Sequence, residues 1–182
     1  QPCQIHSPKD ALACGISAVY QDPQMIESYT GYENIFLGSE GPSRSVFSPI
    51  NRRKLRQAAL ELVSRYPFEI DVEKPVYLMT PVEREIIAIL RALSKNCKIL
   101  ILDEPLSGVD VEGMETLMDM LDEIRKNYDL SILMTTHDFS LLPRYADQVV
   151  LIDHGVLIQG DPQTVLDSEE FHRTFHMRGG RA

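Results

Sequence analysis

Four side chains with catalytic chemistry each follow a short apolar run. They are Gln21 after GISAVY, Asp103 and Glu104 after KILIL, and His137 after SILMT and one further threonine. The carboxyl ends of parallel strands meet at one edge of a sheet, and ligands of open α/β sheets bind there. We therefore expect an amide, two acids and an imidazole to gather on one rim.

This set of side chains suits nucleotide hydrolysis. Asp103 can hold Mg²⁺ through a coordinated water, because a hard cation prefers oxygen ligands. Glu104 can polarise an attacking water, while His137 can donate a hydrogen bond toward a γ-phosphate and Gln21 can orient the metal or the water. Positioning and charge stabilisation do most of the work in such a reaction.

Each of these features taken alone has an ordinary structural explanation. A lone Asp–Glu pair is usually a solvated turn, and a lone histidine is usually a hydrogen-bonded surface or core residue. The acids are followed here, however, by Pro105 and the turn SGVD (107–110). The order of all these features along one chain favours the functional reading.

The periodicity of apolar residues predicts an α/β fold. Short runs rich in branched residues predict strands, and three of them are apolar on both faces, which favours a parallel sheet covered by helices. Helical stripes lie between them. The predicted strands are 15–20, 98–102, 131–135 and 148–152, and the stripes fall within 55–63, 86–93 and 114–121.

The chain between the first two predicted strands contains no convincing strand. We interpret residues 22–96 as a helical subdomain inserted into the core, with a Gly-, Ser- and Pro-rich loop at 38–50. Near the end, VVLIDHGVLIQGD predicts a hairpin that turns at His154–Gly155. A short helical tail at 162–176 follows it.

Composition limits the classes of function. A formal net charge of -9 argues against a mainly electrostatic grip on nucleic acid, so we expect no nucleic-acid partner. Three cysteines without metal-ligand spacing favour free thiols and a reducing compartment. No apolar run is long enough for a membrane span. The chain begins at Gln1, which favours processing or a piece of a longer protein.

ILILDEP followed by SGVD and TTHD resembles the nucleotide-binding domain of ABC transporters. The resemblance implies a partial P-loop NTPase-like fold with Asp103 in the Walker B segment, Glu104 as catalytic acid/base, Asp110 in the D-loop and His137 as switch histidine. Gln21 in VYQD is similar to the Q-loop glutamine, a metal ligand together with Asp103. The implied division is 1–21 and 98–182 for the core and 22–97 for the helical subdomain.

SPKDALACGISAVYQD and YENIFLG are similar to stretches of the ATPases that serve ribose-type monosaccharide importers. The resemblance implies ATP and Mg²⁺ as cofactors and coupling of ATP hydrolysis to sugar import. It also implies transmembrane subunits and a second nucleotide-binding domain, fused or separate, as partners. The chain would then lie in the cytoplasm, held on the inner face of the cell membrane by these partners.

The sequence departs from the family pattern in its phosphate loop. No glycine is followed by lysine, so G-x-x-x-x-G-K-[ST] does not occur in these 182 residues. That motif supplies the backbone N–H groups and the lysine that cradle the β- and γ-phosphates. We therefore expect that this chain does not hydrolyse ATP alone and binds it only together with a complete partner domain.

A second departure concerns the signature motif, normally L-S-G-G-Q, at the start of a helix. Its counterpart here is MTPVE (79–83), in which Thr80 keeps a hydroxyl and Glu83 keeps an acceptor, both as candidate nucleotide contacts. Val82 replaces a glycine that allows close backbone approach, and Pro81 lacks an N–H donor. We expect the helix to form with a weakened grip on phosphate.

Two hypotheses from different classes remain open. The chain is the later part of a sugar-import ATPase, which the missing start methionine favours. Alternatively, it is a non-catalytic pseudo-ATPase that binds or regulates a partner ATPase domain or a membrane subunit, which the altered signature favours. DNA-repair and chromosome-structure ATPases fit less well, because this chain has only a short helical stretch between its motifs.

Overall fold

The computed structural model describes residues 4–38 and 51–176. The chain divides into two compact units, Gln1–Thr136 and His137–Ala182, which are described in turn. The predicted loop at 38–50 lies outside the described residues except for Gly38.

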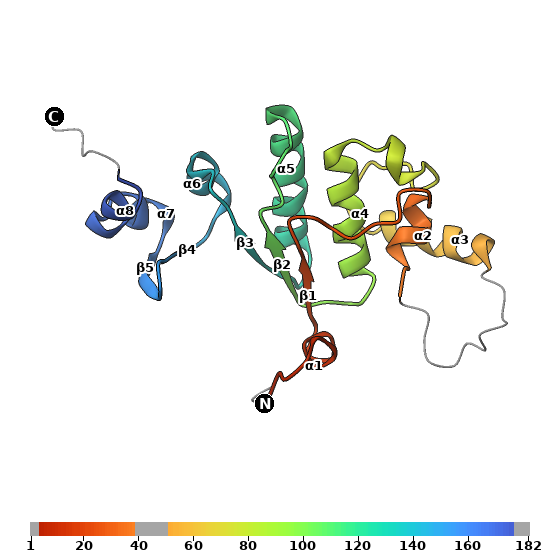
Figure 1. Ribbon diagram of the computed structural model, residues 1–182, viewed down its shortest axis with the longest axis horizontal. Helices are drawn as coiled ribbons and strands as arrows, with labels where there is room; N and C mark the ends of the chain where they lie inside the picture. Colours follow the sequence, from red (N-terminus) through yellow and green to blue (C-terminus); the bar gives the residue numbers. More distant parts are fainter. Residues whose placement is uncertain (1–3, 39–50, 177–182) are drawn as a thin grey trace. The chain divides into compact units, whose positions relative to one another are not determined.

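The first unit contains a parallel sheet, and the helices that connect its first two strands in sequence lie to one side of it (Figure 1). Its strands lie in the order β1 (Ile16–Val19), β2 (Ile99–Asp103) and β3 (Ser131–Thr135). All pairs are parallel, and they stay in register to the last residue, where Asp103 is paired with Thr135. The structure confirms the predicted α/β class and places these three strands within one residue of their predicted bounds.

The two faces of the sheet differ in burial. Along β2, Leu100 and Leu102 are fully buried, whereas Ile99 is 38% exposed, and Leu133 of β3 is 57% exposed. Successive side chains of a strand point to opposite faces, so this alternation defines one covered face and one open face. The covered face belongs to the core of the unit.

The helices of the first unit bury the apolar stripes seen in the sequence. Between β1 and β2 the described residues form only helices and an isolated bridge between Thr30 and Pro75. Helix α4 packs against β1, α2 and α5. A short helix near the N-terminus was not predicted. The elements are α1 (Pro8–Ala13), α2 (Gly31–Ile35), α3 (Arg52–Val63), η1 (Val76–Leu78), α4 (Pro81–Leu93) and α5 (Val111–Asn127).

The second unit begins with η2 (Phe139–Leu141) and α6 (Leu142–Tyr145). It then forms the predicted hairpin, with β4 (Val149–Ile152) antiparallel to β5 (Val156–Gly160). His154 has a left-handed φ of 54° in the turn. Strand β4 is therefore part of a two-stranded sheet with β5.

The tail of the second unit is two helices, α7 (Pro162–Leu166) and α8 (Glu169–Thr174), where the sequence predicted one helical stretch. The break has a local cause, because Ser168 accepts a hydrogen bond from the N–H of Phe171 and so starts a new helix. Leu151, Val165 and Phe171 form the core of this unit.

The prediction of free thiols is wrong for one cysteine. Cys97 is a free thiol, but Cys14 takes part in a disulfide. The spacing of cysteines in the sequence gave no sign of this bond, because a disulfide depends on which residues the fold brings together.

No helix among the described residues is long and apolar enough to cross a bilayer.

The difference between the two sheet faces predicts a difference in stability. Leu100→Ala should lower the free energy of unfolding by about 3 kcal/mol, because it leaves a cavity in a buried site. The matched variant Leu133→Ala, at an exposed position on the neighbouring strand, should cost less than about 1 kcal/mol. Urea unfolding of both variants measures this difference, and equal losses would contradict the assignment of faces.

Candidate functional site

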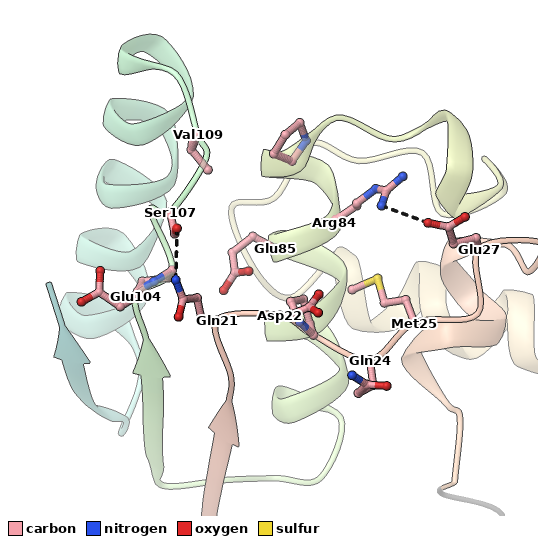
Figure 2. Close-up of a pocket in the computed structure, with 13 residues that line it drawn as sticks. Gln21, Asp22, Gln24, Met25, Glu27, Arg84, Glu85, Glu104, Ser107 and Val109 are labelled. Carbon is pink, nitrogen blue, oxygen red and sulfur yellow. Dashed lines mark hydrogen bonds and ion pairs between the residues drawn. The ribbon is translucent and has the colours of Figure 1, made fainter.

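A cavity of about 300 Å³ lies in the first unit, between the segment that follows β1, the start of α4 and the segment that follows β2 (Figure 2). Four carboxyl groups and one guanidinium line it. Its lining residues are Gln21, Asp22, Pro23, Gln24, Met25, Glu27, Pro81, Arg84, Glu85, Glu104, Pro105, Ser107 and Val109.

Gln21 follows β1 directly and turns toward the segment that follows β2. Its amide Nε2 donates a hydrogen bond to Oγ of Ser107 at 3.3 Å, which joins residues 86 positions apart (Figure 2). The parallel pairing of β1 with β2 brings these two segments to the same edge of the sheet. The predicted Q-loop and D-loop segments are therefore in direct contact.

The two acids at the end of β2 lie in different environments. Asp103 is the last residue of the strand and is exposed, while Glu104 lines the cavity with Gln21. Glu104 has φ of 49°, in the left-handed region that few residues other than glycine adopt. The amide and one of the acids expected on the rim thus share a cavity, with the second acid next in sequence.

The donor set at this rim fits a magnesium ion that is held partly by a nucleotide. Among the described residues no three His, Cys, Asp or Glu side chains form a metal cluster. Mg²⁺ commonly takes one or two protein oxygens and completes its shell with water and phosphate oxygens. Asp103 and Gln21 offer oxygens of the required type.

The roles of the predicted site residues stay predictions, and for two of them the structure does not show the predicted position at the rim either. His137 is the first residue of the second unit, so its convergence with Gln21 and Glu104 stays a prediction. Asp110 begins α5, and its carboxylate accepts a hydrogen bond from the N–H of Gly113 at 3.1 Å. It is a helix cap in this structure, and its contact with nucleotide stays a prediction.

The altered signature motif forms a closed capping box at the start of α4. Oγ1 of Thr80 accepts from the N–H of Glu83 at 3.2 Å, and the carboxylate of Glu83 accepts from the N–H of Thr80 at 2.7 Å. Lys74 Nζ lies 2.8 Å from the same carboxylate. Burial acts to raise the pKa of Glu83, but hydrogen bonds from Lys74 and Thr80 outweigh it and lower that pKa.

Glu85 is a site residue that the sequence analysis missed. It lines the cavity from α4 and is only 6% exposed (Figure 2). Burial raises the pKa of its carboxyl to about 7. Its position four residues before Ile89 places it on the apolar face of the helix, and an acid on such a face was the signal in the sequence.

A second missed feature fixes the backbone that follows Gln21. The side chain of Asn34 is fully buried, and its amide accepts from the N–H of Ile26 at 2.9 Å and donates to the carbonyl of the same residue at 3.0 Å. The guanidinium of Arg91, on α4, donates to the carbonyls of Gln24 at 2.7 Å and Asn34 at 2.8 Å. The Q-loop segment is thus tied to both α2 and α4.

A family model described as ABC transporter matches residues 4–107, more than half of the sequence. The chain belongs to the ABC transporter family. The matched region contains Gln21, the signature segment and the acidic pair of this ATP-binding domain. Asp110 and His137 lie beyond it.

Two sugar-transporter ATPases are among the relatives of this ABC domain. It is 30% identical over 158 residues to the galactofuranose transporter ATP-binding protein of Escherichia coli (strain K12), covering 85% of this chain and 31% of that protein. It is 32% identical over 158 residues to a ribose import ATP-binding protein of Rhodopirellula baltica, covering 87% and 30%. The chain spans about a third of the length of these relatives.

The fold of the ABC domain is also similar to that of solved structures. Superposition on CbiO1 of Clostridium perfringens, described as part of the ABC transporter complex CbiONQ, gives a TM-score of 0.72 at 28% identity. The match covers 98% of this chain and 70% of that one. The similarity extends over both compact units of the sequence.

The buried acid of this ABC domain predicts a pH-dependent stability. The folded-state pKa of Glu85, about 7, is above its ordinary value of 4.5, so the folded state binds the proton more tightly. Its contribution to stability is complete below pH 4.5 and is lost as the pH rises through 7. Glu85→Gln should therefore be more stable than the parent above pH 7, by up to about 3 kcal/mol.

Urea unfolding across this pH range measures the difference, which should disappear below pH 4.5. Glu115→Gln, at an exposed position of α5, is the matched control and should follow the parent at every pH. A parent and a Glu85→Gln variant with parallel pH profiles would contradict the assignment.

The hydrogen bonds of Arg91 predict that it contributes more to the stability of the fold than Arg84, which also lies on α4. Arg91→Met should lower the free energy of unfolding by about 2 kcal/mol, because the carbonyls of Gln24 and Asn34 lose a charged donor. Arg84→Met removes a partly exposed guanidinium 3.6 Å from Glu27 and should cost less than about 0.5 kcal/mol. Thermal or urea unfolding compares the two, and equal effects would show that these contacts do not hold the segment.

Proposed function

We propose that the chain is part of the ATP-binding subunit or half-domain of an ABC importer for a monosaccharide, and that it couples ATP binding and hydrolysis to transport. Its partners are transmembrane subunits and a second nucleotide-binding domain, which hold it at the inner face of the cell membrane. Membership of the family supports the ATPase class. The galactofuranose and ribose relatives support the sugar substrate.

One observation carries the proposal. Gln21 and Glu104 line the same cavity, and Gln21 is hydrogen-bonded to Ser107 in the turn that follows the acids. Parallel pairing brings the two segments to one edge of the sheet, and the residues there, an amide and an acid, are of the types that nucleotide hydrolysis uses. The arrangement is the one expected of a rim that handles a triphosphate.

Each side chain has a defined task in this proposal. Asp103 would hold Mg²⁺ through a coordinated water, Gln21 would orient the metal or the water, and Glu104 would accept a proton from the attacking water. His137 donates a hydrogen bond to the γ-phosphate. Mg²⁺ with ATP supplies charge neutralisation of the phosphates when bound. The helical subdomain, residues 22–97, docks on the membrane subunits.

The phosphate loop of this site must be supplied by residues other than these 182, because no glycine among them is followed by lysine. Backbone N–H groups and a lysine are needed to hold the β- and γ-phosphates. We therefore propose that these residues bind and hydrolyse ATP only together with such a loop. Their own contribution is the rim of acids, amide and imidazole.

A second candidate function is a non-catalytic pseudo-ATPase that regulates a partner domain, and the start of α4 favours it. The N–H groups that would face a partner's γ-phosphate are partly used by the capping box of Thr80 and Glu83. The carboxylate of Glu83 lies where the dipole of the helix would otherwise attract an anion. A composite site that uses this terminus would bind phosphate weakly.

ATP turnover by the assembled transporter separates the two functions. If the chain is catalytic, Glu104→Gln should lower kcat by about 100-fold or more and leave ATP binding intact, because the water loses its base. Glu115→Gln, an exposed position of α5, should leave turnover unchanged. Unchanged turnover in Glu104→Gln would exclude the catalytic role and support the pseudo-ATPase.

A further inference from the structure

One threonine of β3 contacts both acids at the end of β2. Thr135 is paired with Asp103 in the sheet register. Its Oγ1 hydroxyl donates a hydrogen bond to Oδ1 of Asp103 at 2.8 Å and accepts one from the N–H of Glu104 at 2.9 Å. A hydroxyl can donate and accept at the same time, so one side chain joins the two acids.

The hydrogen bond to the N–H of Glu104 acts on a residue whose backbone conformation is unfavourable. Glu104 has φ of 49°, and a residue with a Cβ adopts this left-handed conformation at a cost. The hydrogen bond to its N–H favours that conformation over an extended continuation of β2. Because the direction of a side chain depends on its backbone angles, the same bond helps to fix the direction in which the Glu104 side chain leaves the end of β2.

The bond to Asp103 acts on an exposed side chain. A carboxylate on the surface rotates among several rotamers, and a hydrogen bond from a neighbouring strand selects one of them. The two bonds together fix the carboxylate of Asp103 relative to the backbone of Glu104. A metal ligand and a general base need such a fixed relation.

We propose that Thr135 is a positioning residue for the acidic pair, which it holds in the geometry needed for catalysis. The catalytic consequence rests on the proposed function, whereas the bridge itself does not. The chemistry predicted from the sequence involved the residues after β3, not the last residue of the strand. Thr135 is the first residue of the TTHD segment, in which the resemblance gives a role to His137 alone, so this role adds a member to the site.

If Thr135 had only a structural role, loss of its hydroxyl would not specifically change amide exchange at Glu104 or kcat. Thr135 is exposed and lies on an edge strand of the described sheet, so loss of its hydroxyl removes little core packing. Thr135→Val keeps the shape and the β-branch but cannot form either bond. Thr135→Ser keeps the hydroxyl. Thr116→Val is the matched control, because Thr116 is exposed on α5 and its hydroxyl bonds the local carbonyl of Glu112.

Hydrogen exchange of the Glu104 amide, measured by NMR on residues 1–182, tests the bridge without ATP. Thr135→Val should accelerate exchange at Glu104 by about tenfold or more, while Thr135→Ser and Thr116→Val should leave it unchanged. Thr135→Ala, which also lacks the hydroxyl, provides a second reading should the valine variant fold poorly. Unchanged exchange at Glu104 in the variants without the hydroxyl would overturn the bridge.

ATP turnover by the assembled transporter tests the positioning role. Thr135→Val should lower kcat by about tenfold with an unchanged KM for ATP, and Thr135→Ser should restore kcat. Faster exchange at Glu104 together with an unchanged kcat would overturn the positioning role. A parent transporter that hydrolyses no ATP would instead refute the proposed function, and the exchange measurement would still decide on the bridge.

Discussion

Parallel pairing of β1, β2 and β3 in one register is the constraint on which the site depends. Parallel strands carry their carboxyl ends to the same edge, so the residues that follow them must meet there whatever their separation in sequence. The pairs between β1 and β2 and between β2 and β3 meet this condition. A shift of one residue would turn Asp103 to the other face and remove its partner Thr135.

Helix α4 adds a second level of organisation, because three different tasks lie along it. Its first turn is closed by the capping box of Thr80 and Glu83, its second contributes the buried acid Glu85 to the cavity, and Arg91 near its end holds the segment that carries Gln21. A movement of this helix would therefore change the cavity and the Q-loop segment together. In an ABC transporter, this is the part of the domain through which coupling to the membrane subunits is proposed.

Prediction from sequence succeeded where a pattern had a single physical solution. The apolar runs form strands, and β3 and the hairpin of β4 with β5 lie where their periodicity indicated. The runs also favoured a sheet covered on its faces, whereas Ile99 and Leu133 on one face are exposed. The tail at 162–176 is helical as predicted, but it is divided into two helices because a serine cap inside it starts a second one. The prediction for Cys14 was wrong because a disulfide depends on proximity in space. Glu85 was overlooked because a single acid on an apolar helix face carries no motif.

The sequence by itself determined the class of the fold and which side chains end the strands, because these follow from periodicity and residue type. Its motifs resemble those of the ABC transporter family, to which the family match assigns the chain. Only the tertiary structure decided which groups touch. It joined Gln21 to Ser107 and the carboxylate of Glu83 to Thr80 and Lys74. It also linked the hydroxyl of Thr135 to the carboxylate of Asp103 and to the N–H of Glu104. Hydrogen bonds depend on distances of a few tenths of an ångström, and such distances arise only when separate segments pack together.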